Sequence, residues 1–282
     1  MCLQYHNLVT LHTDNVCSIL ISQMTTILSL RSTMSTPTYS RAILKISGES
    51  FSTDGILGID PDELNIIASQ IAQAVEGGTQ LAVVVGGGNM IRGSELASRI
   101  GIPQATADYM GMLGTVINAL ALKEAIEKHG QPARVMSAID IESVAEPFIR
   151  ARALRHFEKG RVLILAAGTG NPFFTTDTCA SLRAIELGAD ILLKATKVDG
   201  VYDADPNVDT SATRFDRLTF SEAISKKLGV MDLTALSMCM EHDLPVVVFN
   251  FKTHGNICRV IAGESIGTLV TNEETKMANS QG

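Results

Sequence analysis

The sequence is poor in aromatic residues and in charge. It contains no tryptophan, and all aromatic residues together make up 5% of the 282 positions. The core must therefore be built mainly from aliphatic side chains. Hydrophobic residues make up 45% and charged residues 19%, a composition that excludes an intrinsically disordered chain. The formal net charge is −7, which argues against a protein that coats nucleic acid or binds an anionic membrane.

Signals for disulfides and for protein-held metals are also missing. The five cysteines include no C-x-x-C pair, and the six histidines include no H-x-x-x-H or H-E-x-x-H pair. We therefore predict neither a disulfide framework nor a zinc site, and we assign no metal to protein side chains. Unpaired cysteines are typical of a reducing compartment, so we expect a cytoplasmic protein.

No hydrophobic run is long enough to span a membrane. Residues 16–30 are the most apolar stretch, but four polar residues interrupt them between positions 22 and 26. No Lys or Arg precedes Arg31, so the positive region of a signal peptide is absent. We interpret residues 1–38 as a disordered extension or a start assigned too early. We expect one folded domain over 39–272, followed by a flexible tail over 273–282.

Short aliphatic runs alternate with helical patterns from Arg41 onward. The predicted strands are 41–47, 80–86, 133–137, 161–166, 190–194, 245–250 and 268–271. Helical patterns lie at 60–77, at about 108–128 and at 176–188. Most of the strands are continuously apolar, as strands buried on both faces are. This order predicts an α/β fold, a three-layer αβα sandwich around a mainly parallel sheet.

The first predicted strand carries a lysine and ends in a Ser-Gly pair. Lys45 lies within an otherwise apolar run, where an ammonium group is costly unless it reaches a polar site. Ser47 and Gly48 follow, and a glycine there allows backbone amides to approach a polyphosphate. The alternative is a lysine that extends to solvent from an edge strand.

Three glycines follow the second predicted strand. Gly86, Gly87 and Gly88 remove every Cβ where the chain turns, so several N–H groups are free to face one anion. Arg92, four residues later, offers a planar fork for phosphate oxygens. The alternative is a tight strand–helix turn with a solvated arginine, but we favour phosphate binding.

Two further loops follow predicted strands at the edge where parallel sheets bind ligands. Residues 168–177 combine small and hydroxyl residues with Phe173 and Phe174, which favours a pocket for a base or ribose over an aromatic plug on the core. Residues 194–206 place two lysines around Thr196, with Tyr202 nearby. This pattern suggests a lip, meaning a loop at the rim of the site that contacts adenine and triphosphate. The alternative is a turn with residues that face solvent.

These segments, taken in order, resemble the amino-acid-kinase superfamily. The strings GGGNMIRG, MGM, GTGNPFFTTD, KATKVDGVYDADP and VMDLTA are most similar to those of the bacterial uridylate kinases. The resemblance extends over about residues 39–271. It implies an acceptor-binding lobe up to about residue 175 and an ATP-binding lobe after it. It also implies Mg²⁺-dependent transfer of phosphate from ATP to UMP, giving UDP for pyrimidine nucleotide synthesis.

The resemblance also assigns residues to the two ligands. The positions that match the ATP site are Lys45, Ile46, Ser47, Gly48, Gly88, Arg92, Thr196, Tyr202 and Asp205. The positions that match the UMP site are Gly87, Asp108, Thr169, Gly170, Asn171, Pro172, Phe173, Phe174, Thr175 and Thr176. The expected catalytic residues are Lys45, Arg92, Lys197 and Asp232.

Family members are usually homohexamers, often activated by GTP and inhibited by UTP. Leu57 stands where many of them carry an aromatic residue in the segment linked to GTP. Two alternatives remain open. One is a superfamily relative that phosphorylates a carboxylate or carbamate, and the other is a nucleotide-binding protein of the same fold without turnover.

Overall fold

A ten-stranded, mainly parallel sheet organises the chain. The computed structural model describes residues 38–53, 56–91, 101–206, 208–209 and 211–277. The strands are β1 (Arg41–Ile46), β2 (Gln80–Val85), β3 (Ala133–Ser137), β4 (Glu146–Pro147), β5 (Val162–Ala166), β6 (Ile191–Thr196), β7 (Phe215–Thr219), β8 (Val246–Asn250), β9 (Thr268–Thr271) and β10 (Lys276–Met277). Their order in the sheet is β10-β7-β9-β8-β6-β1-β2-β5-β3-β4. In the part of the chain that the structure describes, only β8 with β9 and β7 with β10 pair antiparallel.

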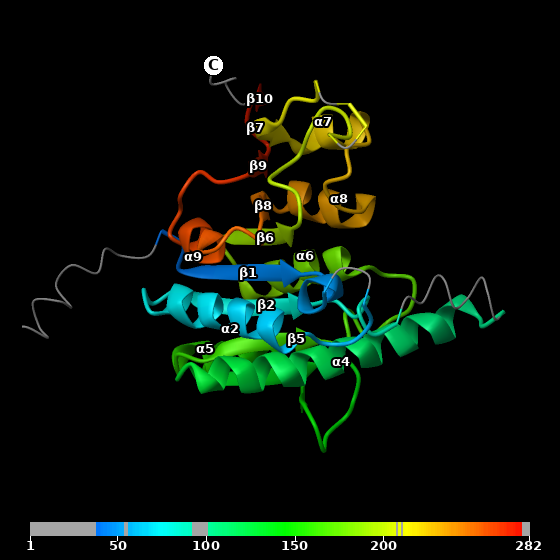
Figure 1. Ribbon diagram of the computed structural model, residues 1–282, viewed down its shortest axis with the longest axis vertical. Coiled ribbons are helices and arrows are strands. Elements are labelled where there is room, and N and C mark those ends of the chain that lie inside the picture. Colours follow the sequence, from blue (N-terminus) through cyan, green and yellow to red (C-terminus); the bar gives the residue numbers. More distant parts are fainter. Residues whose placement is uncertain (1–37, 54–55, 92–100, 207, 210, 278–282) are drawn as a thin grey trace, which may run out of the picture. The chain divides into compact units, whose positions relative to one another are not determined.

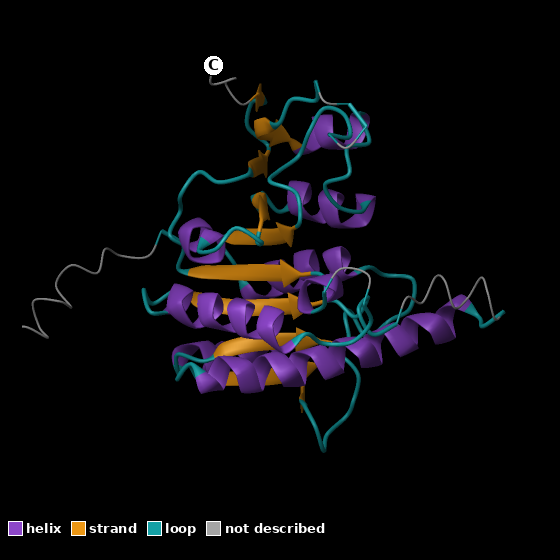
Figure 2. Cartoon of the chain, viewed as in Figure 1, coloured by secondary structure: helices purple, strands orange, loops and turns teal. Residues whose placement is uncertain are grey.

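Helices cover both faces of this sheet, as Figure 2 shows. They are η1 (Gly48–Phe51, a 3-10 helix), α2 (Pro61–Val75), α4 (Gln104–Lys128), α5 (Arg150–Glu158), α6 (Thr176–Leu187), α7 (Phe220–Ser225), α8 (Leu233–Glu241) and α9 (Asn256–Ile261). Helices α2, α4 and α9 pack on one face, and α5, α6, α7 and α8 pack on the other. The predicted three-layer sandwich is therefore confirmed.

Alternating residues of each strand pack into the two hydrophobic cores, one on each face of the sheet. In β1, Leu44 and Ile46 pack beneath α2 and α4, whereas Ile43 packs beneath α6, and all three are fully buried. Strands buried on both faces need apolar residues at every position, which is the pattern that the sequence shows. The sheet is therefore held from both sides, and its strand ends are fixed relative to one another.

The predicted helices form close to their expected limits. Asp60 caps α2 by accepting from the backbone of Asp62 at 2.9 Å, with Pro61 in the first turn. Thr175 caps α6 in the same way, and Gly188 ends it in the left-handed region. The helix predicted at about 108–128 begins earlier, at Gln104 directly after Pro103, and places Asp108 in its second turn. Pro103 is the N-cap residue, and its missing N–H costs nothing at the start of a helix.

Candidate active site at the carboxyl edge of the sheet

The predicted binding segments meet at one edge of the sheet. Strands β6, β1, β2 and β5 are neighbours and run parallel, so their carboxyl ends lie side by side (Figure 1). The ends of these four strands and the loops that follow them contain most of the described residues that we predicted to bind nucleotides, and Asp108 lies in α4. The long helix α4 extends past the same strand ends, which gives this edge a wall (Figure 1).

The glycine turn after β2 is pressed against two other segments. A Cβ on Gly48 would lie 2.4 Å from the nitrogen of Gly88, and a Cβ on Gly87 would lie 2.5 Å from the carbonyl oxygen of Gly111 in α4. Real Cβ atoms do not approach so closely, so glycine is required at both positions. The absence of side chains therefore brings the turn after β1, the turn after β2 and helix α4 into direct backbone contact.

A cavity of about 340 Å³ opens between α4, the glycine turn and the loop after β5. The predicted UMP-site and ATP-site residues that line it are Gly87, Gly88, Asp108, Thr169, Asn171, Phe174, Thr175 and Thr176. Gly170, Pro172 and Phe173 belong to the same loop but do not line the cavity. Residues from three chain segments thus line one cavity.

Asp108 joins two walls of this cavity, helix α4 and the loop after β5. Its Oδ2 accepts a hydrogen bond from the backbone nitrogen of Phe173 at 2.8 Å, and its Oδ1 accepts one from the Gln104 amide at 2.7 Å. Phe173 has a φ of 70°, and its side chain points outward with 74% of the residue exposed. The carboxylate therefore fastens the loop after β5 to helix α4.

A compact charged cluster lies next to the cavity. Asp177, directly after the cavity residue Thr176, forms ion pairs with the ammonium groups of Lys45 and Lys194, each at 2.8 Å. The three side chains are only 12–14% exposed. Lys45 and Lys194 are register partners on β1 and β6, so two like charges lie side by side and Asp177 balances them.

The cluster alters the acidity of its members. Burial raises the pKa of Asp177, but the two ammonium groups outweigh burial and hold the pKa below its usual value. Burial lowers the pKa of Lys194, and the nearby Lys45 charge adds to this while Asp177 opposes it. Buried ionic groups with shifted acidity, placed beside a cavity, are typical of an active site.

Asp177 and Lys194 were not among the predicted site residues. A signal was present, because Leu-Lys-Ile-Ser at the end of β1 and Leu-Lys-Ala-Thr at the end of β6 place a lysine at the same point of two apolar strands. A second buried lysine at the same edge would have required a nearby carboxylate. The sequence interpretation instead used Lys194 only as part of the lip around Thr196.

Asp232 connects the cluster to α8. It caps this helix by accepting from the nitrogen of Ala235 at 3.0 Å, and both of its oxygens lie 3.0 Å from the hydroxyl of Thr178. The Thr175 hydroxyl also donates to it. Asp232 therefore anchors the first turn of α6, the turn that carries Asp177.

The predicted nucleotide lip follows β6. Thr196 ends this strand and donates to the carbonyl of Val198 at 2.7 Å, while the hydroxyl of Tyr202 donates to Asp199 at 2.7 Å. That hydrogen bond, with some help from burial, raises the pKa of Tyr202. The backbone carbonyl of Asp205 accepts from the backbone nitrogen of Val208 at 3.0 Å. Thr196 therefore lies at the end of the strand, and Lys197, Tyr202 and Asp205 lie in the segment that follows it.

Two other predicted residues lie beside the cluster. Ile46 is fully buried in the core, so only its backbone is available to a ligand. The hydroxyl of Ser47 lies 3.3 Å from that of Ser50. Arg92, expected to contact phosphate, lies outside the described residues.

The described residues offer no donor set for a metal held by the protein. They contain no group of three or more histidine, cysteine or acidic side chains that could hold one. The two carboxylates of the site that lie nearest the lysines are already engaged, Asp177 by Lys45 and Lys194, and Asp232 by hydroxyl and amide donors. No helix in the described part of the chain is long and apolar enough to cross a bilayer.

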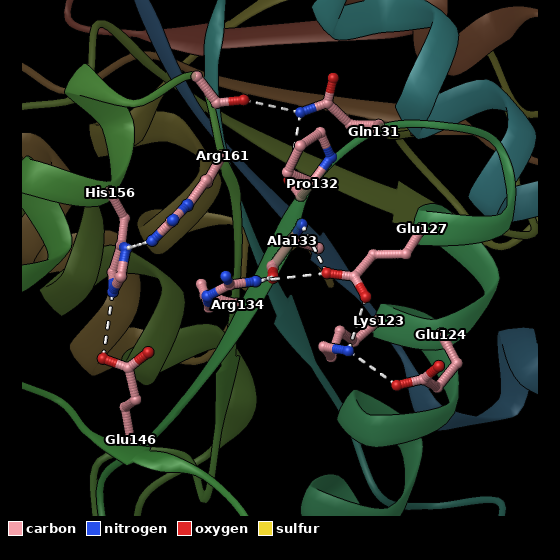
Figure 3. A network of polar contacts seen from close by, with 11 residues as sticks. Lys123, Glu124, Glu127, Gln131, Pro132, Ala133, Arg134, Glu146, His156 and Arg161 are labelled. Carbon is pink, nitrogen blue, oxygen red and sulfur yellow. Dashed lines mark hydrogen bonds and ion pairs between the residues drawn. The ribbon is translucent and has the colours of Figure 1, made fainter.

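A second polar network lies at the opposite edge of the sheet (Figure 3). Glu127, near the end of α4, accepts from Lys123 at 2.7 Å and from Arg134 at 3.3 Å. Arg161 donates to Nδ1 of His156, and the other ring nitrogen lies 3.1 Å from Glu146. These contacts join α4, β3, β4 and α5 near the amino ends of β3 and β5. The network supports the scaffold away from the cavity.

Comparisons with known proteins agree with this geometry. The sequence matches the Amino acid kinase family over residues 40–250. A uridylate kinase from Rubrobacter xylanophilus is 55% identical over 234 residues, which cover 83% of this chain and 92% of that protein.

Solved structures give the same result. The UMP kinase from Bacillus anthracis has a TM-score of 0.83 and 36% identity, with 86% of this chain and 99% of that chain covered. The UMP kinase from Ureaplasma parvum has a TM-score of 0.78 and 36% identity, with 82% and 98% covered. The chain therefore belongs to the amino acid kinase family.

Proposed function

We propose that this protein catalyses transfer of the γ-phosphoryl group of ATP to UMP, giving UDP and ADP, in pyrimidine nucleotide synthesis. The observation that carries the proposal is the cavity bounded by Asp108 and the loop after β5, directly beside the Lys45–Asp177–Lys194 cluster. One ligand would occupy the cavity, and its phosphate would point toward the lysines. The relatives named as uridylate and UMP kinases support this choice of acceptor.

The reaction needs little covalent chemistry from the protein. An oxygen of the UMP phosphate attacks the γ-phosphorus of ATP, and the bond from that phosphorus to the β–γ bridging oxygen breaks, leaving its electron pair on ADP. The attacking phosphate is largely dianionic near neutral pH, so no strong general base is required. Catalysis then depends on alignment of the two ligands and on neutralisation of the charge that spreads over the transferred group.

Lys45 and Lys194 are the described cations best placed for this neutralisation. Their ammonium groups are held 2.8 Å from one carboxylate, so their positions are fixed before any ligand arrives. Lys197 and Arg92 would add charge from the adjoining segments. Mg²⁺ would enter as part of the MgATP substrate. We assign Asp232 a positioning role, because it anchors the helix turn that carries Asp177.

The glycine turns and the lip after β6 would hold ATP. Backbone amides of the segments around Gly48 and Gly88 would face the phosphates, since these two turns are in contact. Thr196, Tyr202 and Asp205 would hold the adenosine end. The ribose and base of UMP would lie against Asp108 and the loop after β5, with Phe174 at the cavity wall.

The test is release of ADP by the purified chain with MgATP and one acceptor at a time. UMP should support release, whereas CMP, acetylglutamate and aspartate should not. Release with acetylglutamate or aspartate would favour a kinase that acts on carboxylates. Tight ATP binding without UMP-dependent release would favour a nucleotide-binding protein without turnover.

Regulation, assembly and location remain predictions from the resemblance. We expect a cytoplasmic homohexamer that is inhibited by UTP, whereas Leu57 argues against the activation by GTP that many family members show. Repeating the UMP assay with each of these nucleotides tests the regulation. Light scattering of the purified protein tests the hexamer.

A further inference from the structure

A closed pair of buried asparagine amides lies beneath the glycine turn. Asn89 follows the turn and is 2% exposed, and Asn118 lies in the middle of α4 and is fully buried. The Asn89 amide nitrogen donates to Oδ1 of Asn118 at 3.0 Å, and the Asn118 amide nitrogen donates to Oδ1 of Asn89 at 2.6 Å. The two side chains thus form reciprocal hydrogen bonds that join the segment after β2 to α4.

Backbone carbonyls complete the pair and define its orientation. The Asn118 nitrogen also donates to the carbonyl of Gly86 at 2.8 Å, and the Asn89 nitrogen also donates to the carbonyl of Gly58 at 2.8 Å. Carbonyl oxygens only accept, so neither amide is able to flip without losing two hydrogen bonds. All four amide protons of the pair have acceptors, which makes the network rigid.

The pair joins four segments that surround the candidate site. Asn118 fixes the start of the glycine turn at Gly86, whose successors Gly87 and Gly88 line the cavity. A Cβ on Gly48 would lie 2.7 Å from Oδ1 of Asn89, so the turn after β1 rests on the same amide. The backbone nitrogen of Gly58 donates to the carbonyl of Asn89 at 2.8 Å.

We propose that Asn118, acting through Asn89 and Gly86, is a positioning residue for phosphoryl transfer. It would set the position of the glycine turn relative to Gly48, and hence the alignment of the two phosphorylated ligands. Neither amide needs to touch a ligand for this role. The proposal rests on the proposed function for its kinetic consequence, but the placement of the turn is testable without turnover.

The test compares Asn118→Leu, which keeps the size of the side chain, with the wild-type chain. We expect kcat/KM for UMP to fall about 10- to 100-fold, with a raised KM, because small misplacements of bound groups are that costly. Hydrogen exchange measured by mass spectrometry should speed up in peptides that cover residues 84–91. Asn118→Ala, which removes the amide without adding apolar volume, provides the same readings if the leucine variant does not fold.

Thr79→Val is the matched control. Thr79 is 5% exposed, precedes the amino end of β2 and donates one hydrogen bond to the carbonyl of Tyr39 at 3.0 Å. Its loss removes one hydrogen bond of a buried residue away from the turn and should leave KM and exchange at 84–91 unchanged. A double variant with Asn89→Ala and Asn118→Ala should lose little more activity than the worse single variant, since both disrupt one network.

Two results would overturn the proposal. One is a folded Asn118→Leu protein with wild-type kinetics and wild-type exchange at the turn. The other is exchange that speeds up uniformly along the chain, with no excess at residues 84–91, which indicates a purely structural residue. If the wild-type chain released no ADP with UMP, the proposed function would fail, yet exchange at the turn would still decide the role of Asn118.

Discussion

Replacing Asp177 with asparagine tests the charged cluster most directly. The change keeps the shape of the side chain but removes the negative charge between Lys45 and Lys194, each 2.8 Å away. Two ammonium groups that are only 12–13% exposed would then face each other without compensation. Removal of one partner from a buried ion pair costs about 3–5 kcal/mol of the free energy of unfolding. We expect Asp177→Asn to lose an amount in this range at pH 7.

The pH dependence of that loss identifies its origin. Burial and the Lys45 charge already lower the pKa of Lys194, and removal of Asp177 should lower it further. A lysine with a lower pKa in the folded state binds fewer protons there than in the unfolded chain. The free energy of unfolding therefore rises with pH until the unfolded lysine, with a pKa of about 10.4, also deprotonates. The deficit of the variant should shrink between pH 7 and pH 10, as measured by urea unfolding.

The wild-type carboxylate should make the free energy of unfolding depend on pH in acid as well. Its pKa lies below the usual value in the folded state, so its contribution is complete above the unfolded pKa of about 3.9. That contribution is lost as the pH falls through the folded pKa. Asp177→Asn should therefore lack part of the acid sensitivity of the wild-type chain.

Glu127→Gln is the matched control for this experiment. Glu127 also contacts two cations, Lys123 and Arg134, but its side chain is 31% exposed and lies far from the cavity. Exposed ion pairs contribute about 0–1 kcal/mol, so this variant should be nearly as stable and as active as the wild type. Asp177→Asn should lower kcat/KM by about 10- to 150-fold, the equivalent of one charge-assisted contact. Equal stability and equal activity of the two variants would refute the reasoning.

Three further substitutions address the other parts of the site. Lys45→Met should lower kcat/KM in the ADP-release assay by about 10- to 150-fold while the chain stays folded, because one charge-assisted contact to phosphate is lost. Asp108→Asn keeps an acceptor for the loop amide but removes the charge, so KM for UMP should rise by roughly tenfold, about 1.4 kcal/mol, with little change in melting temperature. Gly87→Ala places a Cβ 2.5 Å from the carbonyl of Gly111 and should cost about 1–3 kcal/mol in urea unfolding, whereas a Cβ on Gly88 meets only a side-chain atom at 3.9 Å and should be tolerated by the fold.

The layers of the fold were predictable because its strands are buried on both faces. Continuous apolar runs such as 80–86 have no other simple interpretation when helical patterns lie between them. Strands β4, β7 and β10 were not predicted. β7 reads Phe-Asp-Arg-Leu-Thr, so charged residues interrupt its apolar pattern. β4 and β10 have two residues each, and each exists only because a neighbouring strand supplies partners, β3 for β4 and β7 for β10. Such pairing is decided by tertiary contact, which local sequence does not encode.

The cavity was predictable for a related reason. Glycine and hydroxyl residues after apolar strands mark loops at the ligand-binding edge, and the order of parallel strands brings these loops together. The placement of Asp108 came from the resemblance alone. Its hydrogen bond to the backbone of Phe173 joins positions 65 residues apart, and no pattern in either segment indicates it.

The Lys45–Asp177–Lys194 cluster could not be predicted from the local sequence of any one segment. Each lysine alone is explained by extension toward solvent, and Asp177 alone is an ordinary first-turn acid of α6. Only the parallel register, which makes Lys45 and Lys194 partners, turns three unremarkable residues into one charged unit. Asp177 is the carboxylate that contacts both ammonium groups, and the charge of Asp232 also acts on Lys194. Two lysines with little exposure at neighbouring strand ends, beside a cavity, are therefore the part of the structure that points most directly to an anionic ligand.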